Sequence, residues 1–242
     1  MFKRISRAAF LVATALAVFS SCKKSDSSNN GTNSITADFT YSGAGTAPAN
    51  VSFTNTSSGA TSYQWDFGDN ATSTSVSPSH TYTHGGVFTA TLTATGNGST
   101  KSVSKTVNVT APTSVKIMGV KVLAMPFIDP STGSGWDNSN GPDVFFKFLD
   151  PSNAVLLTGG TAYDVTQSML PISWTVTNGL LINNLTGNYS IEIWDYDTPD
   201  PNDYIGGYYV SFTNAAAAGY PTTLTLQSST TSLQIQLTLQ WQ

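Results

Sequence analysis

Six aspartates in the C-terminal half of the chain stand close enough in sequence to do chemistry together. Asp137 and Asp143 lie six positions apart in a stretch rich in Gly, Asn and Ser, just before the apolar run 144–148. The other four follow an apolar run that ends at Trp194, and they are Asp195, Asp197, Asp200 and Asp203. Carboxylates crowded in this way repel one another, and native chains keep them when something positive neutralises them.

The donor types of these two stretches favour calcium. All six side chains offer hard oxygen ligands, and the sequence contains no histidine or cysteine after residue 112. Such a set selects calcium over zinc or copper, and magnesium is less suited because it keeps its waters. Asp is also common in turns, so a purely structural interpretation as polar turn residues stays open. An EF-hand is excluded, because the twelfth-position Glu and the helices are missing.

Strands, not helices, must position these aspartates. Apolar and polar residues alternate with period two in several runs, and no stretch has a helical period. Charged residues make up only 10% of the 242 residues, against about 25% in an average soluble protein. We therefore expect an all-β protein of two β-sandwiches. The clearest strand-like runs are 51–53, 88–95, 103–109, 115–122, 144–148, 189–193 and 233–241.

The spacing of the aspartates resembles that of a C2 domain. In that family one loop gives two Asp six apart before a strand, and a later loop carries Asp-x-Asp-x5-Asp followed by Ile-Gly, as in Asp195, Asp197, Asp203 and Ile205-Gly206. The resemblance implies an eight-stranded sandwich over 113–242, with the circularly permuted second topology. It also implies that Asp137, Asp143, Asp195, Asp197 and Asp203 hold calcium, with Asp200 as a further ligand. The second loop lacks basic or bulky apolar residues at its tip, which argues against membrane insertion.

A second signature lies in the N-terminal half. The run from Tyr63 to Asp69 reads YQWDFGD, and Pro78-Ser79-His80-Thr81-Tyr82 follows it. This pair of motifs resembles the PKD (polycystic kidney disease) domain, which implies an immunoglobulin-like sandwich over 37–111 that acts as a spacer or interaction module. Trp65 is then expected in the core, and His80 is expected to be structural.

The N-terminus has the features of a secretion signal. Three basic residues precede an apolar run over 8–19, which is too short to span a bilayer. Cys22 is the only cysteine, and its position resembles that of a bacterial lipobox, which implies lipidation of Cys22 after removal of the signal peptide 1–22. An ordinary secretory signal is the alternative. The polar stretch 23–36 is expected to be a flexible tether, and its charges resemble the surface-export signals of Bacteroidetes lipoproteins.

These features predict a non-catalytic, lipid-anchored protein of the outer membrane or cell surface. The C2-like sandwich would bind a glycan, protein or phospholipid through calcium; alternatively, the protein is a structural or accessory component in which calcium only stabilises the fold. From residue 112 onward there are three lysines against ten acidic residues, which argues against nucleic-acid binding. The paired carboxylates of a glycosidase are a third interpretation, but the aspartates are too crowded for two distinct pKa environments, so we predict no enzyme.

Overall fold

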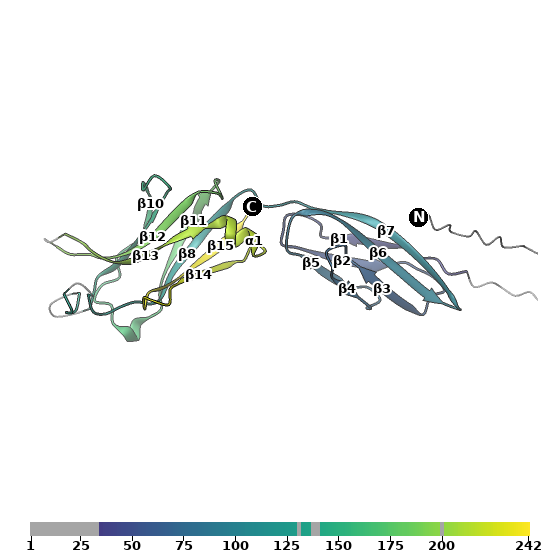
Figure 1. Cartoon of the computed structure of the whole chain (residues 1–242), viewed down its shortest axis with the longest axis horizontal. Helices are drawn as coiled ribbons and strands as arrows, with labels where there is room; N and C mark the ends of the chain where they lie inside the picture. The colour runs from purple at the N-terminus through teal and green to yellow at the C-terminus, as the bar shows by residue number, and fades with distance from the viewer. Residues whose placement is uncertain (1–33, 130–131, 137–140, 199–200) are drawn as a thin grey trace, which may run out of the picture. The chain divides into compact units, whose positions relative to one another are not determined.

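A computed structural model describes residues 34–129, 132–136, 141–198 and 201–242 of the chain. The regular secondary structure of the described residues is almost entirely β-strand, as predicted (Figure 1). The N-terminal sandwich contains seven strands: β1 (Phe39–Ser42), β2 (Ala49–Asn55), β3 (Ser62–Asp66), β4 (Thr72–Ser73), β5 (Ser79–Tyr82), β6 (Gly86–Gly96) and β7 (Ser99–Val109).

Two antiparallel sheets make up this first sandwich. One has the order β1-β2-β5 and the other the order β4-β3-β6-β7. Its core is dominated by aromatic rings, and Trp65 is fully buried there, as predicted, with its ring 5.1 Å from Phe39 and 5.5 Å from Phe53. Such edge and tilted arrangements are the favoured geometries of buried aromatic pairs.

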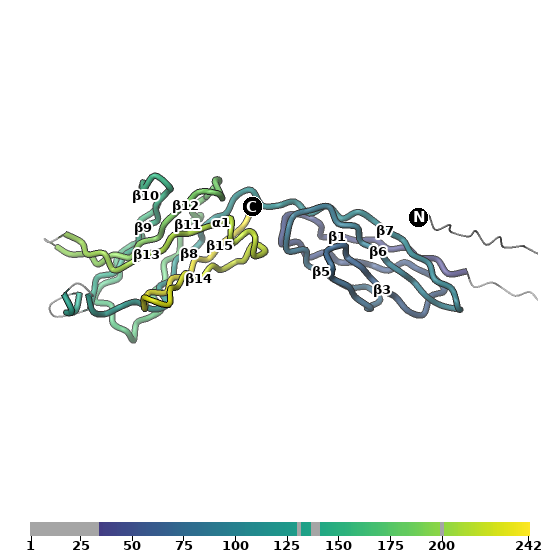
Figure 2. Tube along the Cα trace, in the orientation of Figure 1, coloured from purple at the N-terminus to yellow at the C-terminus, as the bar shows by residue number. Residues whose placement is uncertain are grey.

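In contrast to the aromatic core, the outer face of the four-stranded sheet β4-β3-β6-β7 carries hydroxyl groups. β6 and β7 form a long hairpin whose strands run side by side (Figure 2). Across it, Thr and Ser hydroxyls pair at 2.8 to 3.1 Å, in the pairs Thr91–Ser104, Thr93–Ser102 and Thr95–Thr100. The alternation of Thr with apolar residues in 88–95 thus places the apolar side chains in the core. It places the Thr hydroxyls on the outer face, where they form hydrogen bonds across the two strands.

The described residues of the second sandwich form eight strands, the number that the C2 resemblance implied. They are β8 (Val115–Ala124), β9 (Val144–Leu149), β10 (Val155–Thr158), β11 (Ile172–Ile182), β12 (Asn188–Asp195), β13 (Asp203–Ser211), β14 (Thr223–Gln227) and β15 (Gln234–Trp241). They form two four-stranded antiparallel sheets, in the orders β10-β9-β12-β13 and β11-β8-β15-β14.

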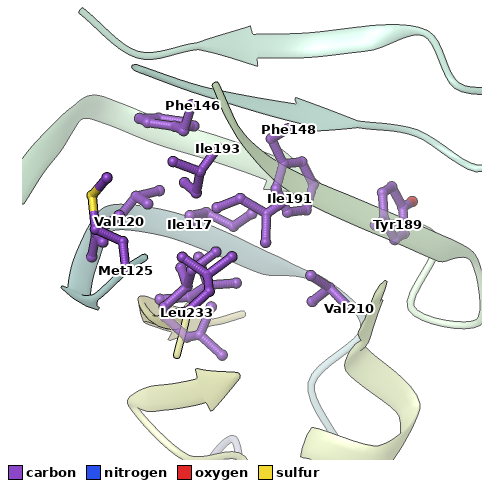
Figure 3. Packing of buried hydrophobic residues seen from close by; sticks show 14 of the residues in the cluster. Ile117, Val120, Met125, Phe146, Phe148, Tyr189, Ile191, Ile193, Val210 and Leu233 are labelled. Carbon is purple, nitrogen blue, oxygen red and sulfur yellow. The ribbon is translucent and has the colours of Figure 1, made fainter. Parts of the chain in front are cut away.

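The core of the second sandwich lies between these sheets. Figure 3 shows Phe146 and Phe148 of β9 and Ile191 and Ile193 of β12 on one side, with Ile117 of β8 opposite. All five are buried, because alternate residues of each strand point to the same face. This packing fixes the strand ends from which the acidic stretches emerge.

One short helix was not predicted. α1 (Phe212–Ala217) follows β13, and its N-cap Ser211 accepts a hydrogen bond from the Asn214 backbone N–H at 3.3 Å. Six residues are too few to show a helical period in the sequence, and Ser is a preferred N-cap. A 3₁₀ turn also spans Gln167–Met169. Within the described ranges, no helix is long and apolar enough to cross a membrane.

Candidate functional site

Three neighbouring strands of one sheet bring predicted aspartates to the same end of the second sandwich. Asp195 is the last residue of β12, and in the sheet it pairs with Val144 of β9 on one side and with Asp203 of β13 on the other. Asp143 directly precedes Val144. The register therefore places Asp143, Asp195 and Asp203 next to one another, although they are far apart in sequence.

Asp195 is the central residue of this group. Its side chain is fully buried, which is rare for a carboxylate. Its Oδ1 atom accepts a hydrogen bond from the Asp143 backbone N–H at 2.6 Å, and the Tyr196 N–H donates to the Asp143 carbonyl oxygen at 2.8 Å. These two bonds tie the segment before β9 to the end of β12.

The Asp143 side chain joins a third segment to the site. Its Oδ1 atom accepts a hydrogen bond at 2.8 Å from the backbone N–H of Asp164, which lies between β10 and β11. Asp164 has φ +51°, in the left-handed region that Asp tolerates. The sequence analysis missed Asp164, because it stands alone between strands and shares no spacing with the other aspartates.

Asp197 and Asp203 complete the described part of the group. The Asp197 N–H donates to Asn202 Oδ1 at 3.0 Å, which closes the loop between β12 and β13. Asp197 is half-buried, and Asp203 is exposed. The exposure of these carboxylates therefore increases from Asp195 through Asp197 to Asp203.

The donor chemistry fits calcium, but the described residues do not complete a metal centre. Among them, no three Asp, Glu, His or Cys side chains gather closely enough to hold a metal ion. Two predicted ligands, Asp137 and Asp200, lie outside the described residues, as does the lipidation candidate Cys22. The structure thus brings Asp143 and Asp195 into direct contact, and it places Asp197 and Asp203 on the flanking segments.

A second feature lies on the outer face of the sheet β10-β9-β12-β13. Tyr204 and Tyr209 of β13 are 52% and 84% exposed, and they border a recess of about 140 Å³. Burial, and after it the Glu192 carboxylate, raises the pKa of the Tyr204 phenol, so this hydroxyl stays protonated. The sequence analysis missed this recess, because the bulge opposite Ile193 and Trp194 decides which side chains of β13 face outward.

In the first sandwich, the two predicted motifs meet in space. Tyr82 is fully buried, and its hydroxyl donates to the Phe67 carbonyl oxygen at 2.9 Å. His80 Nε2 lies 2.7 Å from Asp69 Oδ2, and the His80 ring stacks on Phe67 at 4.3 Å. These contacts give His80 a structural role, in agreement with the sequence-based interpretation.

Comparison with known proteins identifies the first sandwich. Residues 25–111 match the PKD domain family. The crystal structure of the PKD1 domain of Vibrio anguillarum Epp is 34% identical, with 32% of this chain and 95% of that domain covered and a TM-score of 0.30. A solution NMR structure of a Methanosarcina mazei protein is 29% identical over 45% of this chain and 75% of its own, with a TM-score of 0.31.

A third solved structure covers more of the chain at lower similarity. It belongs to a study of promiscuous carbohydrate-binding modules of the β-sandwich superfamily, and it is 12% identical over 87% of this chain and 92% of its own, with a TM-score of 0.31. That likeness is too low to carry an argument about function. No curated protein matches the chain. The match over residues 25–111 shows that the chain contains a PKD domain.

Proposed function

We propose that this protein is a non-catalytic binding protein of the bacterial cell surface, anchored by a lipid on Cys22. Its second sandwich is a C2-like domain that binds calcium through the segments around Asp143 and Asp195. The PKD domain then stands in the chain between the anchored N-terminus and the calcium-binding sandwich, as a spacer.

The observation that carries this proposal is the fully buried Asp195 carboxylate beside Asp143. Removing an ionised carboxylate from water costs several kcal/mol unless charge and hydrogen bonds compensate. The Asp143 backbone N–H contributes to that compensation, and the side chains of Asp143, directly before β9, and of Asp203, at the start of β13, add negative charge. A divalent cation held by oxygen ligands would offset both the burial and the repulsion.

The strand order of the second sandwich supports the C2-like interpretation. Its eight described strands agree in number with the sandwich that the resemblance to the C2 family implies, and they form two four-stranded sheets. The segments before β9 and after β12 are neighbours because β9 and β12 pair directly. This is the arrangement that two calcium-binding loops at one end of a sandwich require.

Calcium would be held by Asp143, Asp195, Asp197 and Asp203, together with Asp137 and Asp200 outside the described residues. When bound, the ion supplies positive charge that can also accept an oxygen ligand from a partner. The chain itself contributes the alignment: Asp195 is fixed by the Asp143 N–H, and Asp143 by the Asp164 N–H. A carboxylate, phosphate or sugar hydroxyl of a neighbouring molecule is the partner chemistry that such an ion takes.

The test is a calorimetric calcium titration of the segment Ser34–Gln242, which holds every residue of both cores. The matched variants are the double substitution Asp195→Asn with Asp197→Asn, and Asp150→Asn, which lies in the β9–β10 turn. We expect saturable binding in the parent and in Asp150→Asn, and none in the double variant. Calcium at 100 times its Kd should raise the free energy of unfolding by about 2.7 kcal/mol.

The same samples separate the two roles of calcium. Calcium-dependent retention on bacterial cells, glycans or phospholipid vesicles supports the binding protein. A higher melting temperature in calcium without any such retention supports the structural or accessory role. If millimolar calcium gives neither a heat of binding nor a change in melting temperature, the proposed calcium site is refuted.

A further inference from the structure

We propose that the outer face of the sheet β10-β9-β12-β13 is a calcium-independent binding groove for a neutral glycan chain. The groove is distinct from the acidic segments at the end of the sandwich. It depends on exposed tyrosines and on a glycine, and none of the four predicted calcium ligands that the structure describes lines it.

A glycine at the centre of β13 lets the β12 backbone and the Tyr204 phenol come close to the strand beside this recess. On the outer face of β13, Gly207 lies between Tyr204 and Tyr209, and its partner on β12 is Glu192. A Cβ atom placed on Gly207 would lie 3.0 Å from the Tyr204 hydroxyl, so the phenol extends over the glycine. The two tyrosines thereby form the walls of the groove, and β12 forms its floor.

Polar groups converge on this floor. Asn153 and Ser190 line the recess beside Glu192. The Glu192 carboxylate is held in place, because its Oε2 accepts a hydrogen bond from Trp194 Nε1 at 3.0 Å. Carboxylate, amide and hydroxyl groups together offer both donors and acceptors, as a ligand with several hydroxyls requires.

The charges of the face favour a neutral ligand. Lys147 of β9 pairs in register with Glu192, and its Nζ lies over the Trp194 ring at 4.1 Å. One cation and one anion therefore stand side by side, and the three lysines of the whole C-terminal half offer little to an anionic membrane. Glu192 would repel an acidic polymer, and Lys147 would repel a basic polymer.

A sugar ring matches both the size and the mixed character of the groove. Its C–H face can contact a tyrosine ring while its hydroxyls reach polar groups at the rim, and tyrosine provides such rigid, amphipathic contact area at low entropic cost. The recess of about 140 Å³ is smaller than the roughly 300 Å³ at which pockets for drug-sized ligands begin. We therefore assign to it at most one sugar unit, and the rest of a chain would lie along the open face.

The experiment measures binding of Ser34–Gln242 to four soluble neutral polysaccharides, in EDTA: mixed-linkage β-glucan, arabinoxylan, galactomannan and dextran. Affinity electrophoresis in gels that contain each polymer gives the dissociation constant. Tyr209→Ala is the principal variant, because a side chain that is 84% exposed can be removed without disturbing the core. Tyr163→Ala is the matched control, since Tyr163 is 62% exposed and lies outside the groove.

We expect at least one polymer to retard the parent in EDTA. Tyr209→Ala should weaken that interaction about tenfold, as truncation of a central aromatic contact does. Tyr163→Ala should leave it unchanged. Glu192→Gln, which keeps the acceptor for Trp194 but removes the charge, should weaken binding less than Tyr209→Ala.

Three results would overturn the inference: no retardation by any of the four polymers, equal retardation of the parent and Tyr209→Ala, or binding that appears only in calcium. The last result would assign glycan binding to the acidic segments and so favour the proposed function alone. Conversely, a chain that binds no calcium but binds a polymer in EDTA would retain the groove and lose the calcium site.

Discussion

The hydroxyl of Tyr82 offers the sharpest test of how the PKD motifs hold the first sandwich together. Tyr82→Phe keeps the buried ring and its contact with Phe88 at 4.3 Å, but it removes the hydrogen bond to the Phe67 carbonyl oxygen. A buried hydrogen bond contributes about 1 kcal/mol, and a carbonyl left without its donor adds about 1 kcal/mol or more. We expect the free energy of unfolding of this domain to fall by about 1–2 kcal/mol.

Calorimetric melting of Ser34–Gln242 measures this effect. For a domain of 60–100 residues, a loss of 1 kcal/mol lowers Tm by roughly 4–8 °C. Tyr63→Phe is the control, because Tyr63 is only partly buried and its hydroxyl donates to the Ala60 carbonyl oxygen at a long 3.4 Å. Tyr63→Phe should shift Tm by much less.

The same hydroxyl group also makes the stability of the domain depend on pH. Burial, and after it the Asp69 carboxylate, raises the pKa of Tyr82 above its ordinary value of 10.0. A group whose folded pKa is raised contributes stability that is full below the unfolded pKa and is lost as pH rises toward the folded pKa. The parent should therefore lose stability above pH 10 more steeply than Tyr82→Phe. Equal Tm values for Tyr82→Phe and Tyr63→Phe, with parallel alkaline slopes, would refute the role assigned to this hydroxyl.

Two further predictions concern turns. Gly68 has φ +83°, and a Cβ there would lie 2.8 Å from the backbone N and O of Thr89, whereas Gly98 has φ +71° with nothing within 4 Å. Gly98→Ala should cost only the left-handed penalty of about 1–2 kcal/mol, and Gly68→Ala clearly more, in urea titrations; similar costs would contradict the contact with Thr89. Asp150 has its pKa lowered from 3.8 by the Ser152 hydroxyl and the Ala154 N–H. The Tm advantage of the parent over Asp150→Ala should therefore be present above that value and disappear as pH falls below it; a constant difference would exclude the charge as its cause.

The sequence predicted the strands well because burial imposes a period of two. The run 233–241 alternates strictly, and β15 occupies Gln234–Trp241 with its apolar residues toward the core. The short helix after Ser211 and the irregular pairing of β11 with β8 left no such period. Local alternation reports which face is buried, but not where a strand bulges.

The site was predicted in part for a related reason. Spacing along the chain indicated Asp143 and Asp195, and pairing between β9 and β12 places them in contact. Asp164 and the groove around Gly207 depend on segments that become neighbours only after folding. To predict these two features one must know which segments lie side by side and in which register, and a single sequence does not give this information.

The hydroxyl pairs across β6 and β7 have a consequence for the conditions under which the PKD domain works. Dissolved salt screens interactions between exposed charges, but it has little effect on a neutral Thr–Ser hydrogen bond. The long hairpin is linked across its outer face by such neutral pairs. This face therefore keeps its cross-strand bonds at low and at high ionic strength alike.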